Sequence, residues 1–488
     1  MNLDYSGLAH ALFPESTLVL GALLVLGFDL IAGKSRGLED RLRAAVSIGG
    51  LAVLIAAYFT ASTGPVGSVF GGVLMLDTLA LLTRLGVLML TFFTLTVIPG
   101  VTRLRHPAEY VSVILFATAG FTLMAAAQQL LLIFLAIELA SLSLYVLAGF
   151  DKTRPESAEA ALKYFLFGGM AAAFLLFGFS LLYGLTGSIE LPRIADAFHA
   201  GAGGPLLSVA LVMVLVAFGF KVAAAPFHLW APDVYEGAPA PSAALIASAS
   251  KLAGVTVFMR LLWPGLGAVA GKFNAPLDHA GWLTVVAVVS AASLLLGNLA
   301  ALAQTSVRRL LAYSAIAHAG AMLIGVMAAG RAGPGPVYYY ATTYGLATVG
   351  AFGVINVIEH HGGGPKLTDF AGLHRRSPLL AVCLLVYFLS LAGVPPLAGF
   401  FGKFAVFAAA LQAGGIASPI GLLAVLAIAL SAVGLYYYLI VLKHALVVAP
   451  APNSARIVVP ADVAFGLCTV AALLLVLGIF PSVILRVF

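Results

Sequence analysis

The stretch FKVAAAPFHLWAPDVYEGAPAPSAALIASASKLAG, residues 220–254, decides the fold of this chain. Four prolines interrupt a region that is apolar on both sides: Pro226, Pro232, Pro239 and Pro241. Because proline lacks a backbone donor and clashes with the preceding helical turn, a helix through this stretch must break or kink. Lys221 and Lys251 flank the break. A broken helix with lysines in apolar surroundings is typical of a membrane protein with an internal site.

The composition of the whole chain supports a membrane location. Of its 488 residues, 62% are hydrophobic and 9% are charged, and the mean hydropathy is +1.09. Soluble domains carry about 25% charged residues, so a water-soluble globule is excluded. The net charge of +6 does not indicate nucleic-acid binding, because the basic residues lie mainly in the loops between apolar runs.

Apolar runs long enough to cross a bilayer recur along the whole chain and predict about 14 transmembrane helices. The spans begin near Phe13, Leu42, Met75, Tyr110, Leu130, Ser157, Leu206, Ala240, Gly281, Arg309, Val337, Pro378, Pro419 and Ala461. The amino terminus lacks the basic region of a cleavable signal peptide, so we expect the first span to be retained. An even number of spans places both termini on the same side.

The basic residues of the loops predict the orientation. Fifteen lie in one set of loops: Lys34, Arg36, Arg41, Arg43, Arg103, Arg105, Lys152, Arg154, Arg308, Arg309, Lys366, Arg375, Arg376, Lys443 and Arg456. Four lie in the alternate set: Arg193, Lys272, Arg331 and Arg486. Because Lys and Arg are retained on the cytoplasmic face, we expect periplasmic termini in a bacterial inner (plasma) membrane.

Among the charged residues at membrane depth, four are the first candidates for function: Glu138, Lys221, Lys251 and Lys403. A charge at the centre of a membrane helix costs about 2.5–3.5 kcal/mol, and proton relays are a common reason to retain one. Two unit charges about 12 Å apart at an effective dielectric of about 20 interact by about 1.4 kcal/mol. Protonation of one site can therefore favour the loss of a proton from its neighbour. The alternative is that these charges only pair to hold helices together.

Three further residues are weaker relay candidates. His228 and His318 lie near or inside apolar helices, where histidine can exchange protons or remain neutral and hydrogen-bonded. Lys163 lies in the second turn of its helix, where its side chain can also extend to the membrane interface. Asp77 and Arg84 are two helical turns apart on one face, and we interpret the arginine as a structural anchor.

Motifs for cofactors and metals are absent from the sequence. It contains no nucleotide-binding glycine loop, no C-x-x-C and no H-E-x-x-H. Cys383 and Cys468 each lie inside an apolar run. The run 359–361, Glu-His-His, is a poor metal site because adjacent histidines on a helix diverge. We therefore expect no cofactor and no metal in this chain.

Four segments together resemble the antiporter-like membrane subunits of proton-pumping NADH:quinone oxidoreductase, respiratory complex I. They are ELASLSLYVLAGF (138–150), residues 220–254, RRLLAYSAIAHAG (308–320) and SLAGVPPLAGFFGKF (390–404). The second contains the pattern PFHxWxPDxYxGxPxP followed by an intramembrane lysine. The resemblance covers essentially the whole chain. It is strongest to the subunit N branch, because subunit M carries a glutamate where Lys403 stands here.

The resemblance implies an all-α polytopic fold with two inverted five-helix repeats, each containing a broken helix. Three helices would form residues 1–109, the repeats would form 110–265 (break near 221–232) and 266–448 (break near 392–403), and a last helix would form 449–488. Glu138 and Lys221 would pair in the first half-channel, with Lys251 as the central lysine and Lys403 in the second half-channel.

The resemblance also implies partners. Flavin and iron–sulfur clusters would lie in other subunits of the complex, and the neighbours would resemble subunits M and K and the lateral helix of subunit L, with lipids around them. Two alternatives remain open. The chain could be a large subunit of a multisubunit Na⁺/H⁺ antiporter, or a scaffold subunit whose buried charges only join helices.

Overall fold

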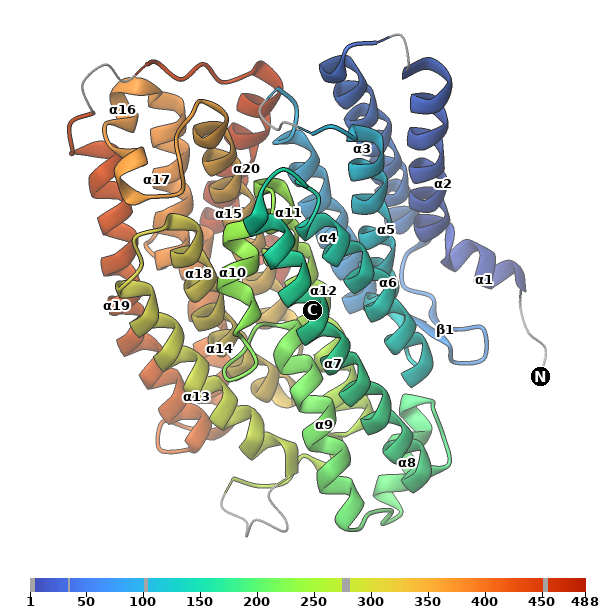
Figure 1. Ribbon diagram of the computed structural model, residues 1–488. Helices are drawn as coiled ribbons and strands as arrows, with labels where there is room; N and C mark the ends of the chain where they lie inside the picture. The colour runs from blue at the N-terminus through green and yellow to red at the C-terminus, as the bar shows by residue number, and fades with distance from the viewer. Residues whose placement is uncertain (1–4, 34–35, 101–103, 274–280, 451–454) are drawn as a thin grey trace.

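The computed structural model of the protein describes residues 5–33, 36–100, 104–273, 281–450 and 455–488. Lys34 and Arg103, two of the basic loop residues named above, lie outside these ranges. The described chain is a bundle of long helices that run between two ends, with one small hairpin at its edge (Figure 1). Helices dominate because, in lipid, each span must satisfy its backbone hydrogen bonds internally.

The first part of the chain contains these elements in order: α1 (Tyr5–Ala11), α2 (Phe13–Phe28), α3 (Leu38–Thr63), β1 (Gly67–Val69), β2 (Leu74–Leu76), α4 (Thr78–Thr96), α5 (Pro107–Ala126), α6 (Leu130–Ala148), α7 (Pro155–Thr186), α8 (Leu191–His199), α9 (Pro205–Lys221), α10 (Trp230–Gly237), α11 (Ala240–Ala247) and α12 (Ala249–Arg260).

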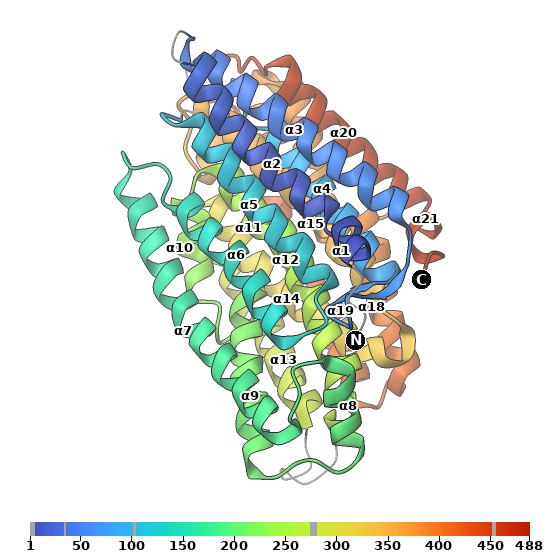
Figure 2. The same cartoon turned by 90° about the vertical axis from the view of Figure 1, so that its right-hand side faces the viewer.

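The second part contains α13 (Gly281–Leu302), α14 (Val307–Ala332), α15 (Gly335–His360), α16 (Leu373–Arg376), α17 (Pro378–Ala392), α18 (Ala398–Gly414), α19 (Pro419–Leu446), α20 (Ala461–Ile479) and α21 (Ser482–Leu485). Figure 2 shows the same bundle from the side, with the N- and C-termini toward the same end.

The expected fold class is confirmed. Twelve segments of the described chain are long and apolar enough to cross a membrane. The pairs α9–α10 and α17–α18 are the two broken spans, and they fall where the prolines predict them. Together with the twelve, they agree with the expectation of about 14 spans.

Side chains satisfy the backbone at both breaks. At the first break, the indole of Trp230 donates to the carbonyl of Phe220 (3.2 Å), and the amide of Ala225 donates to Ser293 Oγ (2.8 Å). At the second, the amide of Gly399 donates to Ser390 Oγ (3.2 Å). Gly393 ends α17 with a φ of +86°, a conformation that favours glycine. Protein groups thus replace the water that broken backbone requires in lipid.

Two local features differ from the expectation. The span expected near Met75 begins at Thr78, because residues 67–76 form the antiparallel hairpin β1–β2 and Asp77 caps α4 by accepting from the amide of Ala80 (2.8 Å). The span that begins at Ala240 is also interrupted, at Ser248 (φ −114°, ψ −83°), between α11 and α12. Neither proline nor glycine marks that second interruption.

The centre of the bundle consists of α11–α12, α14 and α15. The most apolar windows of α11–α12 and α15 are completely buried, and that of α14 is 94% buried, whereas the outer helices α2 and α7 are largely exposed. Lys251 and His318 lie on these central helices. The chain therefore places titratable groups at the point farthest from lipid.

Candidate functional site

Five titratable residues contribute to the central site, and they come from five helices: Glu138 (α6), Lys221 (α9), Lys251 (α12), His318 (α14) and Lys403 (α18). We call this set the central row. Glu138 and Lys221 share one cavity, and the Lys221 stem packs at Gly254 on the helix that carries Lys251. Lys251 and His318 both lie against the Tyr344 ring, and His318 shares a second cavity with Lys403.

Glu138 and Lys221 line one small cavity between α6, α7 and α9, with about 20 Å³ open to water. The Lys221 amine donates to Ser141 Oγ (3.1 Å) and lies 6.0 Å from the centre of the Phe121 ring. Glu138 is one turn from Ser141 on the same face of α6. The two charges interact through space, but within the described residues they form no ion pair at 4.0 Å or less. A single water is enough to fill the cavity.

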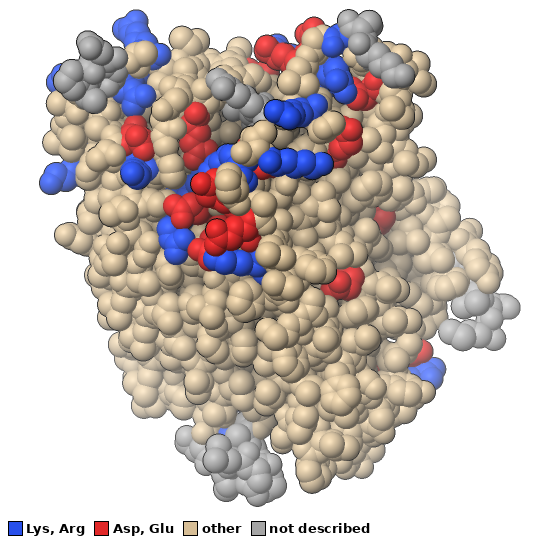
Figure 3. All heavy atoms as spheres, viewed as in Figure 1, with Lys and Arg blue, Asp and Glu red and all other residues tan. Residues whose placement is uncertain are grey.

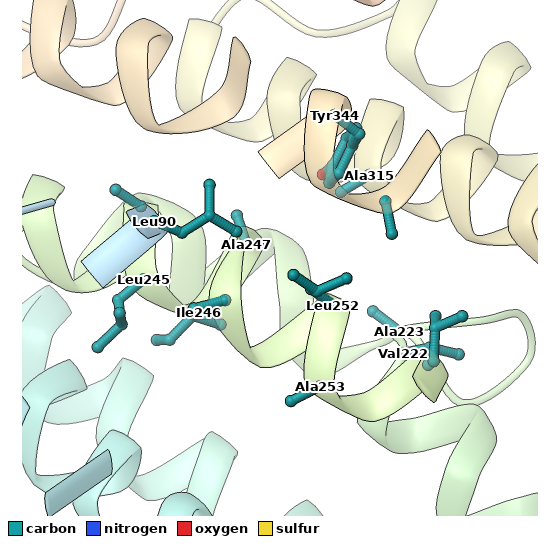
Figure 4. Packing of buried hydrophobic residues seen from close by; sticks show 14 of the residues in the cluster. Leu90, Val222, Ala223, Leu245, Ile246, Ala247, Leu252, Ala253, Ala315 and Tyr344 are labelled. Atoms are coloured by element: carbon teal, nitrogen blue, oxygen red, sulfur yellow. The ribbon is translucent and has the colours of Figure 1, made fainter. Parts of the chain in front are cut away.

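Lys251 follows Lys221 toward the centre of the bundle. Gly254 of α12 gives the Lys221 stem room to pass, because a Cβ at that position would lie 3.3 Å from Lys221 Cγ. The buried Lys251 amine donates to the carbonyl of Ala315 (2.6 Å) and lies 5.3 Å from the centre of the Tyr344 ring. Figure 4 shows Ala315 and Tyr344 beside Leu252 among the buried apolar side chains.

His318 continues the row from α14. Its ring lies 4.8 Å from that of Tyr344, Nδ1 is 2.7 Å from the Tyr340 hydroxyl, and Nε2 is 3.2 Å from the Tyr438 hydroxyl. The Tyr438 hydroxyl also bonds to Ser314. Tyr344 contacts both the Lys251 amine and the His318 ring, and His318 lines one cavity with Lys403, so His318 lies between the central lysine and the last one.

Lys403 ends the row. Its amine donates to the carbonyl of Ala392 (2.9 Å), the last residue of α17, and its stem packs over Gly393. His318, Tyr340 and Lys403 line a second cavity of about 20 Å³. The carbonyl that the break frees is therefore the acceptor for this lysine.

The lysines of the row share one chemical feature. Within the described chain, the amines of Lys221, Lys251 and Lys403 hydrogen-bond to neutral oxygens and to no carboxylate. A lysine bonded in this way can lose its proton without leaving an unpaired carboxylate behind. The arrangement therefore permits proton exchange.

The two weaker candidates outside the row lie elsewhere. His228 is buried in the first break and lines neither cavity of the row. Lys163 pairs with Glu159 (2.6 Å) and Asp233 (2.5 Å), and Asp233 also accepts from Arg309 (2.8 Å). Lys163 is thus part of a partly exposed ion network that joins α7, α10 and α14.

Asp77 and Arg84 do not pair with each other, and Arg84 has the structural contact that we expected. Arg84 pairs with Glu15 at 2.9 Å, and both are buried, whereas Asp77 pairs with Arg260 at 2.7 Å. Asp77 caps the start of α4, the helix that carries Arg84, by accepting from the amide of Ala80. Sequence reasoning also missed the tyrosines around His318, although the runs YYYATTY (338–344) and YYY (436–438) mark them.

No group of three or more metal-binding side chains occurs among the described residues. The site consists of amines, one carboxylate, one imidazole and hydroxyl groups. Such groups can accept, hold and donate protons.

Comparisons with known proteins identify the family of the chain. Residues 127–431 match the family described as NADH:quinone oxidoreductase/Mrp antiporter, TM. NADH-quinone oxidoreductase subunit N 2 of Acidobacterium capsulatum is 46% identical over 499 residues and covers 99% of each chain.

Two solved structures have similar chains. One is from respiratory complex I of Thermus thermophilus with bound aureothin, at 34% identity and a TM-score of 0.78 over 97% of this chain and 99% of that one. A chain of the Mrp complex from Dietzia sp. has a TM-score of 0.82 at 22% identity over 99% and 96%, a likeness of fold. The chain belongs to the NADH:quinone oxidoreductase/Mrp antiporter transmembrane family.

Proposed function

We propose that this protein is the antiporter-like subunit N of a proton-pumping NADH:quinone oxidoreductase, and that it translocates protons through the central row. The observation that carries this proposal is the bonding of Lys221, Lys251 and Lys403 to neutral oxygens across the centre of the bundle. The relatives named above supply the complex to which the chain would belong.

In this proposal, protons reach Lys221 or Lys251 from the cytoplasmic side, pass His318 and leave outward near Lys403. Glu138 sets the proton affinity of Lys221, because the carboxylate and the ammonium share a cavity and interact through space. Charging one member repels the proton on the next. His228 and Lys163 remain secondary candidates that would act at the cytoplasmic side of the first break.

The proposed orientation puts the basic loops in the cytoplasm and both termini in the periplasm of a bacterial inner membrane. It is supported by the surface, because Figure 3 shows the charged side chains gathered toward one end and on one flank. The opposite end carries few charged side chains in that view.

The proposed complex supplies what this chain lacks. Electron transfer through flavin and iron–sulfur clusters would occur in other subunits, and this chain would act as a translocase within an oxidoreductase. Neighbours resembling subunits M and K, the lateral helix of subunit L and lipids would cover the outer helices. The division at residues 110, 266 and 449 is the proposed boundary of the two repeats.

The test uses the intact complex in proteoliposomes. Lys221→Ala and Lys403→Ala should lower the number of protons moved per NADH oxidised while the complex still assembles. Lys272→Ala, which changes an exposed lysine outside the spans, is the control and should pump normally. Unchanged pumping in both row variants would exclude the relay.

Two alternatives give different results. A large subunit of a multisubunit Na⁺/H⁺ antiporter, which the fold likeness to the Mrp complex supports, would purify without flavin and iron–sulfur proteins. A scaffold subunit would tolerate exchange of the charges of Glu138 and Lys221, because only their attraction would matter. A relay would not tolerate this exchange, because each site needs its own proton affinity.

A further inference from the structure

A large polar cavity lies outside the central row, at the end of the bundle that carries the basic loops. It has a volume of about 310 Å³, and Asp151, Arg154, Ala240, Arg308 and Glu359 are among the residues that line it. We call it the vestibule. A single water needs only about 10–15 Å³, so the vestibule has room for many waters.

Arg308 forms one wall of the vestibule. It is almost completely buried, its guanidinium donates to the carbonyls of Glu236 (3.0 Å) and Ala238 (2.6 Å), and it pairs with Glu359 at 2.5 Å. These bonds tie the end of α10 to α14 and α15. The vestibule therefore has a fixed polar wall beside the start of α11.

A line of buried hydroxyls begins behind this wall. Ser242 lies two residues after Ala240, and its Oγ is 2.7 Å from the hydroxyl of Tyr110. Both residues are completely buried, and Tyr110 interacts electrostatically with Arg308. A hydroxyl both donates and accepts a hydrogen bond. The pair is thus able to take a proton from one side and release another on the opposite side.

Two further residues with hydroxyl groups, Ser248 and Thr348, lie between this pair and Lys251. Ser248, at the interruption between α11 and α12, faces α15 at Gly345, where an added Cβ would lie 3.4 Å from the Ser248 Cβ. Thr348 lies one turn from Gly345 in the direction of the vestibule. Lys251 lies three residues beyond Ser248. From Ser242 to Ser248 the helical rise is about 9 Å.

We propose that the vestibule is the proton-uptake site for Lys251 on the basic-loop side, and that the Tyr110–Ser242 pair conducts protons between them. This inference rests on the function proposed above and adds its access route. A proton from vestibule water binds one hydroxyl as that hydroxyl passes its own proton inward. Rotation of both hydroxyls then restores the starting state, so the pair is neither oxidised nor consumed.

The first test removes the two hydroxyls separately in the intact complex. Tyr110→Phe and Ser242→Ala should each slow proton translocation roughly tenfold or more, since a positioned proton-transfer group typically contributes at least this much. The matched controls are Tyr387→Phe and Ser112→Ala, which remove buried hydroxyls bonded to the carbonyls of Leu467 and Ala22. Both controls should translocate protons normally per assembled complex.

The result for Lys251→Ala separates this inference from the proposed function. Normal pumping in Tyr110→Phe and Ser242→Ala, with failure in Lys251→Ala, would overturn the vestibule route and leave the relay in place. Normal pumping in all three would overturn both.

The second test measures access without activity. In a background with Cys383→Ala and Cys468→Ala, Ala240→Cys should react with a membrane-impermeant thiol reagent only from the basic-loop side of sealed vesicles. Ala243→Cys, completely buried on the same helix, should not react. Labelling of Ala240→Cys from the opposite side, or no labelling, would contradict the route.

Discussion

The buried pair of Glu15 and Arg84 permits a quantitative test of the difference between an anchor and a relay. Its nearest atoms are 2.9 Å apart, and Arg84 also donates to the carbonyls of Ala11 (3.1 Å) and Thr122 (3.3 Å). At 2.9 Å and an effective dielectric of about 20, the attraction is about 6 kcal/mol. Much of this offsets the loss of hydration of the two charges. Removing one partner of a buried pair costs about 3–5 kcal/mol.

Arg84→Met should therefore destabilise the subunit by about 3–5 kcal/mol, because it leaves the Glu15 carboxylate buried and unpaired. The double variant Arg84→Met, Glu15→Gln should recover most of that loss. The assay is the thermal midpoint of the purified complex and the fraction of this subunit that is incorporated. Molecules that assemble should pump a normal number of protons per NADH. A double variant as unstable as the single one, or normal assembly with lost pumping, would refute the assignment of this pair as an anchor.

Two further predictions concern the neighbours of the relay lysines. Ser141→Ala removes the acceptor of the Lys221 amine. It should slow proton translocation roughly tenfold, since a hydrogen bond to a charged group contributes about 1.5–3 kcal/mol. Stopped-flow measurement with a pH dye in proteoliposomes checks this rate, and an unchanged rate would contradict the prediction. Asp233→Asn breaks the bridge between Lys163 and Arg309 and should lower stability by about 1 kcal/mol, because the network is partly exposed. Among the described residues, Glu159 pairs with Lys163 alone, so Glu159→Gln should lower the thermal midpoint less than Asp233→Asn does. A larger loss in Glu159→Gln would contradict the bridging role of Asp233.

The architecture could be predicted from the sequence because each span carries its own signal. Hydrophobic length marks a helix that must satisfy its backbone internally, and the prolines mark α9–α10 and α17–α18. The interruption at Ser248 carried no such signal. Ser248 lies against α15 at Gly345, and a single sequence does not show which helices touch.

The candidate site could be predicted in part for the same reason. Glu138, Lys221, Lys251 and Lys403 are visible because a charge in an apolar run is rare and costly. The acceptors of two of these lysines could not be predicted, because they are the backbone carbonyls of Ala315 and Ala392. Every residue has such a carbonyl, and only the packing of the helices decides which one a lysine reaches. The pairing of Arg84 with Glu15 was missed because 69 positions separate them in the sequence. Spacing along one helix pointed to Asp77 instead.

The charged residues of this chain divide by chemistry into two groups. The buried arginines each face a carboxylate within 3 Å: Arg84 with Glu15, Arg260 with Asp77 and Arg308 with Glu359. Arginine remains protonated in proteins, so such pairs are permanent and suit a scaffold. The lysines of the central row bond to neutral oxygens and can lose their protons, since burial shifts the equilibrium of a lysine readily.

This division explains why the proposed relay would need lysine at three positions. An arginine in place of Lys251 would keep its charge at all times and would repel a proton from His318 permanently, whereas a lysine does so only while it is charged. If the central row were purely structural, nothing would explain why its members are lysines bonded to neutral oxygens, because arginine pairs with a carboxylate more strongly than lysine does. The partners of the buried charges thus favour transport over support as the role of the central row.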